Sequence, residues 1–143
     1  MILEQYSKQP STNLATYRRI YPWQPKTKLQ LPKGTTREVA SSFYQLKLGH
    51  GYLRLYLYKL GHVESSICRC GVLETAEHLL LSCREPDLVQ PRAKLRDELQ
   101  GARLSLPLLL HTKIGIEKTL VFLKETSICT RRRYIQRRLE EEE

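Results

Sequence analysis

Apolar residues recur at helical spacing through the middle of the chain. They stand at i, i+4 and i+7, the spacing that places side chains on one face of a helix. Two sets have this spacing, one on each side of a glycine-rich break: Val39, Phe43 and Leu46, then Leu53, Leu57 and Leu60. Thr35 and Glu38 have the spacing of a capping box before the first set. The pattern predicts one helix from about residue 35 that breaks or kinks at Gly49-His50-Gly51, and a second helix over about 52–60.

Shorter helices are predicted in the second half of the chain. Thr75 is placed to cap a helix over about 76–83, and Pro86 ends that region. Pro91 suits the first turn of another helix over 92–100. An apolar face that starts at Ile116 predicts a helix over about 116–125. We expect one small hairpin around residues 68–73, and the end of the chain reads as a solvated helix or a frayed segment.

The first 34 residues contain four prolines and keep no apolar period, so they are predicted to form an extended arm or linker. Aromatic and basic residues alternate within it, and Arg18 and Arg19 lie between Tyr17 and Tyr21. Such a segment can stack on bases and contact phosphates. It also suits a strap that docks its aromatic side chains on another domain.

Charge favours an anionic partner. The chain of 143 residues has 24 Lys and Arg residues against 15 Asp and Glu residues, a net charge of +9. Most of the excess lies in residues 1–60 and in the run from Arg131 to Arg138. An imbalance of this size points first to RNA or DNA, bound through the phosphate backbone. No apolar run is long enough to span a membrane. Four cysteines without a secretory signal favour a reducing nuclear or cytoplasmic compartment.

Four potential metal ligands fall within sixteen residues, in the pattern C-x-C-x7-H-x4-C: Cys68, Cys70, His78 and Cys83. Three thiolates and one imidazole form a ligand set typical of tetrahedral Zn²⁺, and a site closed by four protein ligands is structural rather than catalytic. The alternative is three buried free cysteines and a surface histidine. Cys129 lies apart from the cluster and is expected to be a core or incidental thiol.

The spacing sets conditions on the local backbone. Gly71 permits the positive φ that a tight Cys-x-Cys turn needs. His78 and Cys83 lie about 500° apart around an ideal α-helix, so both reach one ion only if the helix frays or ends near Cys83. Three thiolates and a neutral imidazole would leave a zinc site with one net negative charge, which Arg69 and Arg84 are placed to offset.

The residues that common enzymes need are missing from the sequence. The chain has two aspartates, Asp87 and Asp97, whereas two-metal polymerases and nucleases use several converging carboxylates. It contains no glycine-rich phosphate loop, no G-x-S-x-G elbow and no deaminase signature. We therefore expect no enzymatic activity from this chain.

Several basic residues are candidates for contact with nucleic acid: Arg18, Arg19, Lys47, His50, Arg54, Lys59, Arg131, Arg132 and Arg133. Each has a simpler interpretation. His50 at the glycine break suits a hinge residue that caps a carbonyl, and Tyr52, Tyr56 and Lys59 share a helical face that suits the edge of a core. The run that begins at Arg131 suits a solvated helix face.

Two segments carry a resemblance to a known family: Leu46 to Tyr52, with its Gly-His-Gly centre, and Cys68-Arg-Cys70-Gly71 followed by Glu77-His78-Leu79-Leu80 and Cys83. In these segments the chain resembles the region after the RNase H domain of fungal non-LTR retrotransposon reverse transcriptases. The segment from Leu109 to Leu123 is similar to the end of those polyproteins, so the resemblance covers about residues 30–128.

The resemblance implies a nucleic-acid-associated module in which Zn²⁺ is held by the four ligands of the cluster. The polymerase and RNase H domains of that family have no counterpart here, so their activities are not expected. The alternatives are a zinc-stapled module that docks on polymerase or RNase H domains, and a remnant without function. The predicted fold is mainly α: an extended arm over 1–34, a small helical domain over 35–128 with a CCHC zinc knuckle at 66–85, and a charged tail over 129–143.

Overall fold

The computed structural model of the chain describes residues 30–142, so the arm over 1–29, with Arg18 and Arg19, lies outside the described residues. All of the described residues except Gln30 belong to one compact unit, Leu31–Glu143. Its helices follow in this order: α3 (Arg37–Leu48), α4 (Arg54–Lys59), η1 (His78–Ser82), α5 (Pro86–Glu98), α6 (Leu106–His111), α7 (Lys113–Thr126) and α8 (Arg131–Glu141). A single antiparallel bridge, Ile67 with Leu73, is the β-type pairing within residues 30–142. The predicted mainly helical class is confirmed.

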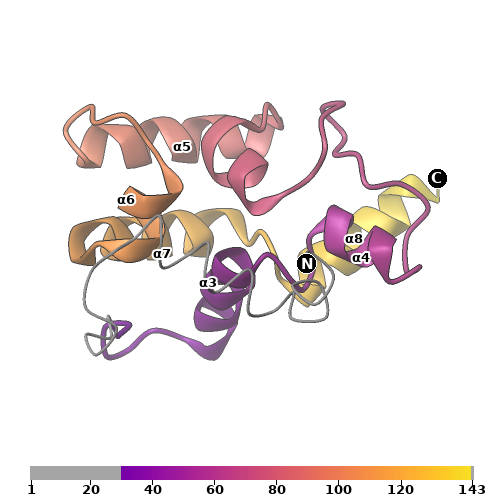
Figure 1. Cartoon of the computed structure of the whole chain (residues 1–143), viewed down its shortest axis with the longest axis horizontal. Helices are drawn as coiled ribbons and strands as arrows, with labels where there is room; N and C mark the ends of the chain where they lie inside the picture. Colours follow the sequence, from indigo (N-terminus) through magenta and orange to yellow (C-terminus); the bar gives the residue numbers. More distant parts are fainter. Residues whose placement is uncertain (1–29, 143) are drawn as a thin grey trace, which may run out of the picture. The chain divides into compact units, whose positions relative to one another are not determined.

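Helix α7 is the centre of the hydrophobic core. It packs against α5, α6 and α3, and it lies between α5 and α3 in the ribbon view (Figure 1). Its apolar side buries Ile116, Phe122 and Leu123 almost completely. Phe43 of α3 and Leu95 of α5 complete the core from the two sides. Removing these side chains from water is the main favourable contribution to the fold.

The first predicted helix forms, and both of its ends are defined by the backbone. Its N-cap is Thr36, whose hydroxyl oxygen accepts from the backbone N–H of Val39 at 3.2 Å, so the predicted cap at Thr35 was one residue early. Thr35 instead donates to the carbonyl of Pro32 at 2.7 Å. At the other end, Gly49 has a φ of 73°, which ends the helix at the predicted break.

The second half of the chain differs more from the sequence prediction. Helix α5 begins at Pro86, and Pro91 lies inside it rather than in its first turn. Pro86 takes the first helical position, where the missing N–H costs little, while Pro91 leaves the carbonyl of Asp87 without its usual helical donor. Helix α6, which was not predicted, begins after Ser105, whose hydroxyl oxygen accepts from the N–H of Leu108.

Helix α7 starts at Lys113, three residues before the predicted start, because Thr112 caps it by accepting from the N–H of Gly115 at 3.0 Å. Helix α4 begins at Arg54 rather than at residue 52, and Leu60 lies beyond its end with 52% of its surface exposed. The charged end forms α8, which buries none of its residues. None of the helices in the described residues is both long and apolar enough to cross a membrane.

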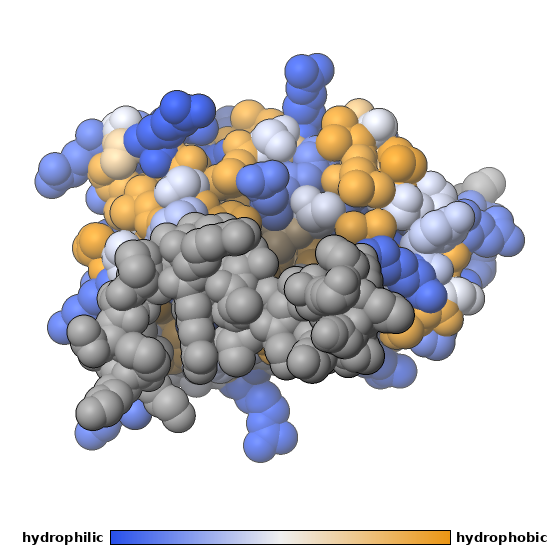
Figure 2. Space-filling model, viewed as in Figure 1, coloured by the Kyte–Doolittle hydropathy of each residue, from blue (hydrophilic) through white to orange (hydrophobic). Residues whose placement is uncertain are grey.

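Hydrophilic residues lie between small groups of hydrophobic residues on the described part of the face seen in Figure 2. Many of the basic side chains of α8 are paired with acidic residues far away in the sequence. Arg133 contacts Asp87 at 2.6 Å, and Arg137 contacts Glu85 at 2.5 Å. These ion pairs hold α8 against Glu85, which follows the metal-ligand candidates, and against the start of α5. Helix α8 has no buried apolar face that could do so.

Candidate metal centre

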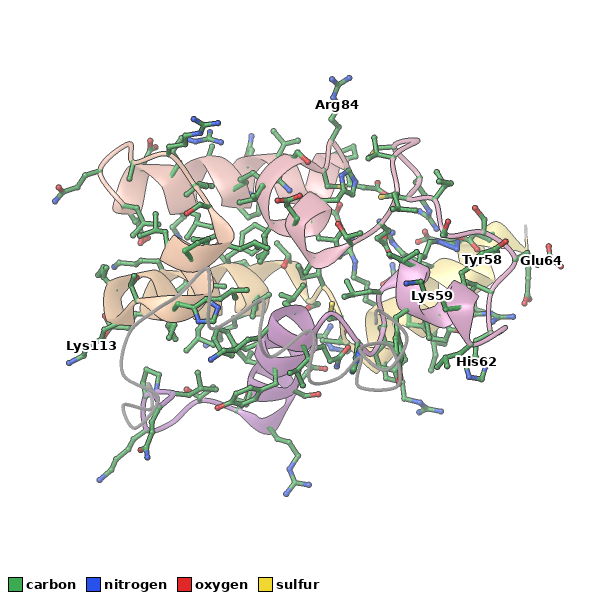
Figure 3. All side chains as sticks on the ribbon, viewed as in Figure 1. Tyr58, Lys59, His62, Glu64, Arg84 and Lys113 are labelled. Atoms are coloured by element: carbon green, nitrogen blue, oxygen red, sulfur yellow. The ribbon has the colours of Figure 1, made fainter. Side chains whose placement is uncertain are left out.

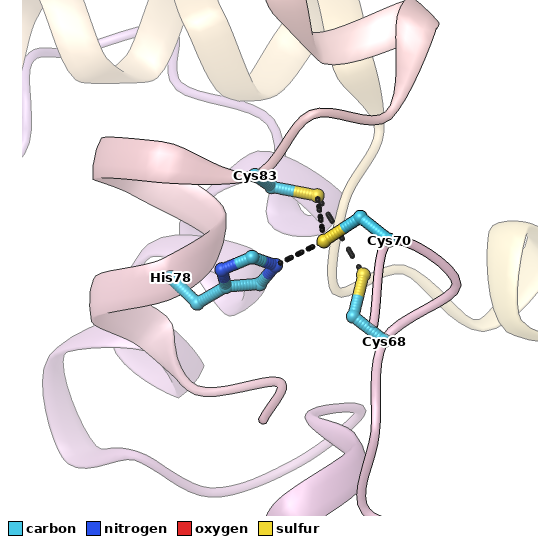
Figure 4. Close-up of side chains that lie close together, drawn as sticks. All are labelled: Cys68, Cys70, His78 and Cys83. Atoms are coloured by element: carbon cyan, nitrogen blue, oxygen red, sulfur yellow. Dashed lines mark hydrogen bonds between the residues drawn. The ribbon is translucent and has the colours of Figure 1, made fainter. Parts of the chain in front are cut away.

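The four predicted ligands converge from two short segments. Cys68 and Cys70 lie on the turn that the Ile67–Leu73 bridge closes, and His78 and Cys83 lie at the start and just after the end of η1. Their ligand atoms all lie within 4.8 Å of one another (Figure 4). The four side chains are therefore close enough to bind one metal ion.

The Cys-x-Cys turn has the backbone that was expected of it. The N–H of Gly71 donates to the carbonyl of Cys68 at 2.8 Å, and the N–H of Cys68 donates to the carbonyl of Val72 at 2.8 Å. Gly71 has a φ of +94°, in the region that glycine occupies without strain. This reversal places the two sulfurs on the same side of the turn.

In the second segment, a π-helical turn brings His78 and Cys83 together although they are five residues apart. The N–H of Cys83 donates to the carbonyl of His78 at 2.8 Å, a bond that spans five residues rather than four. The wider turn brings the two side chains onto one side, and the helix ends at Ser82, followed by Cys83 in an extended conformation with a ψ of 134°. Thr75 caps the helical turn that begins at residue 76 and continues into η1, as predicted, because its hydroxyl oxygen accepts from the N–H of His78 at 3.1 Å.

The distances between the ligand atoms are close to those of a tetrahedral site. The Sγ of Cys68 and of Cys83 are 3.6 Å apart, and the Sγ of Cys83 and of Cys70 are 4.0 Å apart. Thiolates at 2.3 Å from a central zinc would be separated by about 3.8 Å. The Sγ of Cys70 lies 3.0 Å from the Nε2 of His78, a hydrogen-bond distance that must widen slightly around an ion.

Burial sets the protonation of the cluster. Cys68, His78 and Cys83 each expose 5% of their surface or less. Burial raises the pKa of Cys68 and of Cys83, and it lowers the pKa of His78, which favours the neutral imidazole that binds metals. A backbone hydrogen bond from Arg84 is the main cause that lowers the pKa of Cys70. Metal binding at this site would therefore release protons from the buried thiols.

The cation beside this site is not one of the two that the sequence suggested. Arg69 pairs with Glu140 at 2.8 Å, and Arg84 projects away from the helices (Figure 3). The buried cation is Arg92 of α5, which bonds to the carbonyl of Cys83. The sequence analysis missed Arg92, because nothing in the neighbouring sequence distinguishes a buried arginine of a helix from an exposed one. Cys129 is buried and lies apart from the ligand cluster, as expected.

The predicted nucleic-acid contacts are dispersed over the unit, and several have partners within it. Lys47 lies over the ring of Phe43, and His50 stacks on Tyr56 with ring centroids 4.6 Å apart. Lys59 and Arg131 are exposed. Three of the predicted arginines are held by carboxylates of other segments: Arg54 by Glu141, Arg132 by Glu38 and Arg133 by Asp87. The described candidates do not form one continuous patch along a single element.

A cavity of about 630 Å³ lies between α4, the loop over 61–65 and α8. Tyr52 and Tyr134 form part of its wall, with ring centroids 5.1 Å apart. Its lining contains four arginines and four glutamates, so the charges are balanced. The cavity therefore shows no preference for an anion.

Comparison with protein-family models, with curated proteins and with solved structures found no match to this chain. The class of protein that the fold and the site define is a helical protein with a Cys₃His cluster able to hold a metal ion.

Proposed function

We propose that the chain is a zinc-stapled helical module in which one Zn²⁺ ion holds the segment over 66–85 to the helical core. The observation that carries this proposal is the convergence of four ligand atoms within 4.8 Å from two separate turns. Three sulfurs and an imidazole suit Zn²⁺, whereas Mg²⁺ and Ca²⁺ prefer oxygen ligands. Four protein ligands leave no open position for a substrate, which supports a structural role.

The segment between α4 and η1 has little packing of its own, so a metal ion would stabilise it. Between the end of α4 and the start of η1 the backbone makes one bridge and a few turns, and Ile67, Val72 and Leu73 each expose more than 40% of their surface. A segment with so little apolar burial gains little stability from packing. Metal ligation would supply the missing folding free energy, as it does in other small zinc modules.

Metal analysis of protein purified under reducing conditions tests the proposal. We expect about one zinc per chain, and its loss in Cys70→Ser, with melting of residues 66–85. The matched control is Cys129→Ala, which also removes one cysteine but lies apart from the ligand cluster, and it should keep the zinc. Wild-type protein without bound metal would contradict the proposal.

A second proposal is that the module associates with RNA or DNA, as its resemblance to retrotransposon reverse transcriptases suggests. It is favoured by the net charge of +9 and by exposed cations such as Lys59 and Arg131. Affinity that comes from phosphate contacts should fall steeply as salt rises. Filter binding of zinc-loaded protein at low and raised salt tests this, with Lys59→Glu/Arg131→Glu as the variant.

The competing role is docking on polymerase or RNase H domains, with a basic surface that is incidental. A pull-down with such domains, together with no salt-sensitive nucleic-acid binding by the folded protein, would favour docking. The three arginines that pair with carboxylates are less available to phosphates, so binding should be weaker than the number of basic residues alone suggests.

A further inference from the structure

Arg92 is a buried cation whose three hydrogen bonds all go to the backbone of the metal-ligand turn. Only 6% of its surface is exposed. Its Nε donates to the carbonyl of Leu80 at 3.1 Å, its Nη2 to the carbonyl of Leu79 at 2.7 Å, and its Nη1 to the carbonyl of Cys83 at 2.6 Å. The guanidinium thus holds three carbonyls of one turn from the neighbouring helix α5.

These carbonyls need an outside donor. The last carbonyls of a helical segment have no partner within it, and η1 ends at Ser82 with Cys83 as its C-cap. A cation at this end is also favoured by the partial negative charge of the aligned peptide dipoles. The planar guanidinium can donate in several fixed directions at once, which a lysine ammonium cannot do with the same geometry. Arg92 therefore sets where the carbonyl of Cys83 lies, and with it the backbone that carries the sulfur.

The charge of Arg92 is otherwise unbalanced. Within residues 30–142 it makes no ion pair with a carboxylate, and burying a lone charge is costly. Three thiolates, a neutral imidazole and Zn²⁺ together carry one net negative charge. A bound zinc centre would therefore supply the single negative charge that one buried guanidinium requires.

We infer that Arg92 is a positioning residue of the metal centre, which holds the π-helical turn between His78 and Cys83 in the conformation that presents both ligands and neutralises the loaded site. This inference rests on the proposed zinc site. The inference also connects the metal centre to the hydrophobic core, because α5, which carries Arg92, packs against α7 at the centre of that core. Metal loading should therefore stabilise α5 as well as the segment that carries the ligands.

The test compares Arg92→Met and Arg92→Lys with a control on the same helix, Arg96→Met, whose side chain is exposed. Zinc affinity is measured by competition with a chromophoric chelator, and ligand geometry by the absorption of the Co²⁺-loaded protein. Loss of an outer partner of a metal site typically weakens affinity by about 10- to 100-fold. We expect that loss in Arg92→Met with an altered Co²⁺ spectrum, a smaller loss in Arg92→Lys, and no change in Arg96→Met.

A merely structural arginine would lower the melting temperature of zinc-loaded and chelated protein equally and leave the affinity unchanged. That result, or wild-type affinity and spectrum in Arg92→Met, overturns the inference while the proposed zinc site stands. If Arg92→Met is unfolded in both states, Arg92→Lys decides, and wild-type affinity in that variant overturns the inference. Wild-type protein that binds no zinc overturns both proposals.

Discussion

The backbone N–H of Cys83 donates to the carbonyl oxygen of His78 at 2.8 Å, so a single hydrogen bond joins the two ligand residues of the second segment. In an α-helix, side chains five residues apart point to different sides. This bond closes a wider, π-helical turn, which places the side chains of His78 and Cys83 on the same side. The ligand geometry and the backbone geometry of this turn are therefore coupled. An interaction that holds the backbone of the turn also holds the two ligand side chains, and a bound metal ion would stabilise the backbone in return.

Removal of the metal should release this turn. If zinc binds the folded chain alone, a free zinc concentration of 1,000 times Kd adds about 4 kcal/mol of stability, and a chelator removes it. Hydrogen exchange followed by mass spectrometry should show faster exchange over 66–85, including the amide of Cys83, after chelation. Amides in the middle of α7 serve as the internal reference. Equal exchange over 66–85 in both states would show that metal does not support the turn.

Gly71→Ala should weaken metal binding through backbone strain alone. Gly71 has a φ of +94°, and no heavy atom lies within 4 Å of an added Cβ. The left-handed conformation costs a residue with a Cβ about 1–2 kcal/mol, which corresponds to a loss of roughly tenfold in zinc affinity. Gly34→Ala is the matched control, since Gly34 has a φ of +89° in equally open space. It should lower stability without a change in affinity, and an equal loss of affinity in both variants would count against the prediction.

The sequence was sufficient for features that depend on nearest neighbours. Thr75 and Gly71 could be assigned because a cap and a positive-φ turn need particular residues at particular positions. The mainly helical class followed from apolar spacing. The ligand cluster was predicted as a set of four and is brought together as one. Its metal and its biological partner remain predictions.

Features that depend on how one helix packs against another segment could not be predicted from sequence spacing. Arg92 lies nine residues from Cys83, on another helix, and the contact is visible only once the turn between them is folded. The same applies to Arg132 and Glu38, which are 94 residues apart. Pro91 misled the prediction because a proline signals the first turn of a helix, whereas Pro86 already occupied that position.

Arg137→Met should destabilise the fold much more than Arg132→Met. Arg137 contacts Glu85 at 2.5 Å and Glu74 at 3.8 Å, and the three side chains expose 17%, 11% and 6% of their surface. Removing one partner of a fully buried pair costs about 3–5 kcal/mol, and Arg137→Met should lose a large part of that, because Glu74 stays buried without its cation. Arg132 and Glu38 are exposed, so their loss should cost less than about 1 kcal/mol. Urea unfolding of both variants gives the comparison, and equal midpoints would refute this ranking.

Gly115→Ala should destabilise the protein although it lies in a helix. Alanine normally gains about 1 kcal/mol over glycine in a helix interior. Here the added Cβ would stand 1.6 Å from the carbonyl oxygen of Leu108, so α6 and α7 would have to move apart. We expect a net loss of at least about 2 kcal/mol in thermal or urea unfolding. Val121→Ala on the exposed side of α7 should be close to neutral. A gain of stability in Gly115→Ala would mean that the two helices separate at little cost.

Stability should fall as the pH drops from about 6.5 towards 4, through His111. Burial, and then the charge of Lys47, lower the pKa of His111 from 6.5 to about 4. The unfolded chain therefore takes up a proton before the folded one does, so the contribution of His111 is complete above pH 6.5 and is lost below it. Because the side chain is only half-buried, we expect about 1–2 kcal/mol rather than the full value of the shift.

The metal ligands also take up protons in this range, so the measurement is a difference between two proteins. Urea unfolding of the wild type and of His111→Gln, both loaded with zinc, is followed between pH 7 and pH 5. The ligand cluster contributes equally to both, and the difference isolates His111. The wild type should lose more stability than the variant over this interval. Parallel curves would show that His111 has the same pKa in the folded and unfolded chains, and that its position beside Lys47 has no electrostatic consequence.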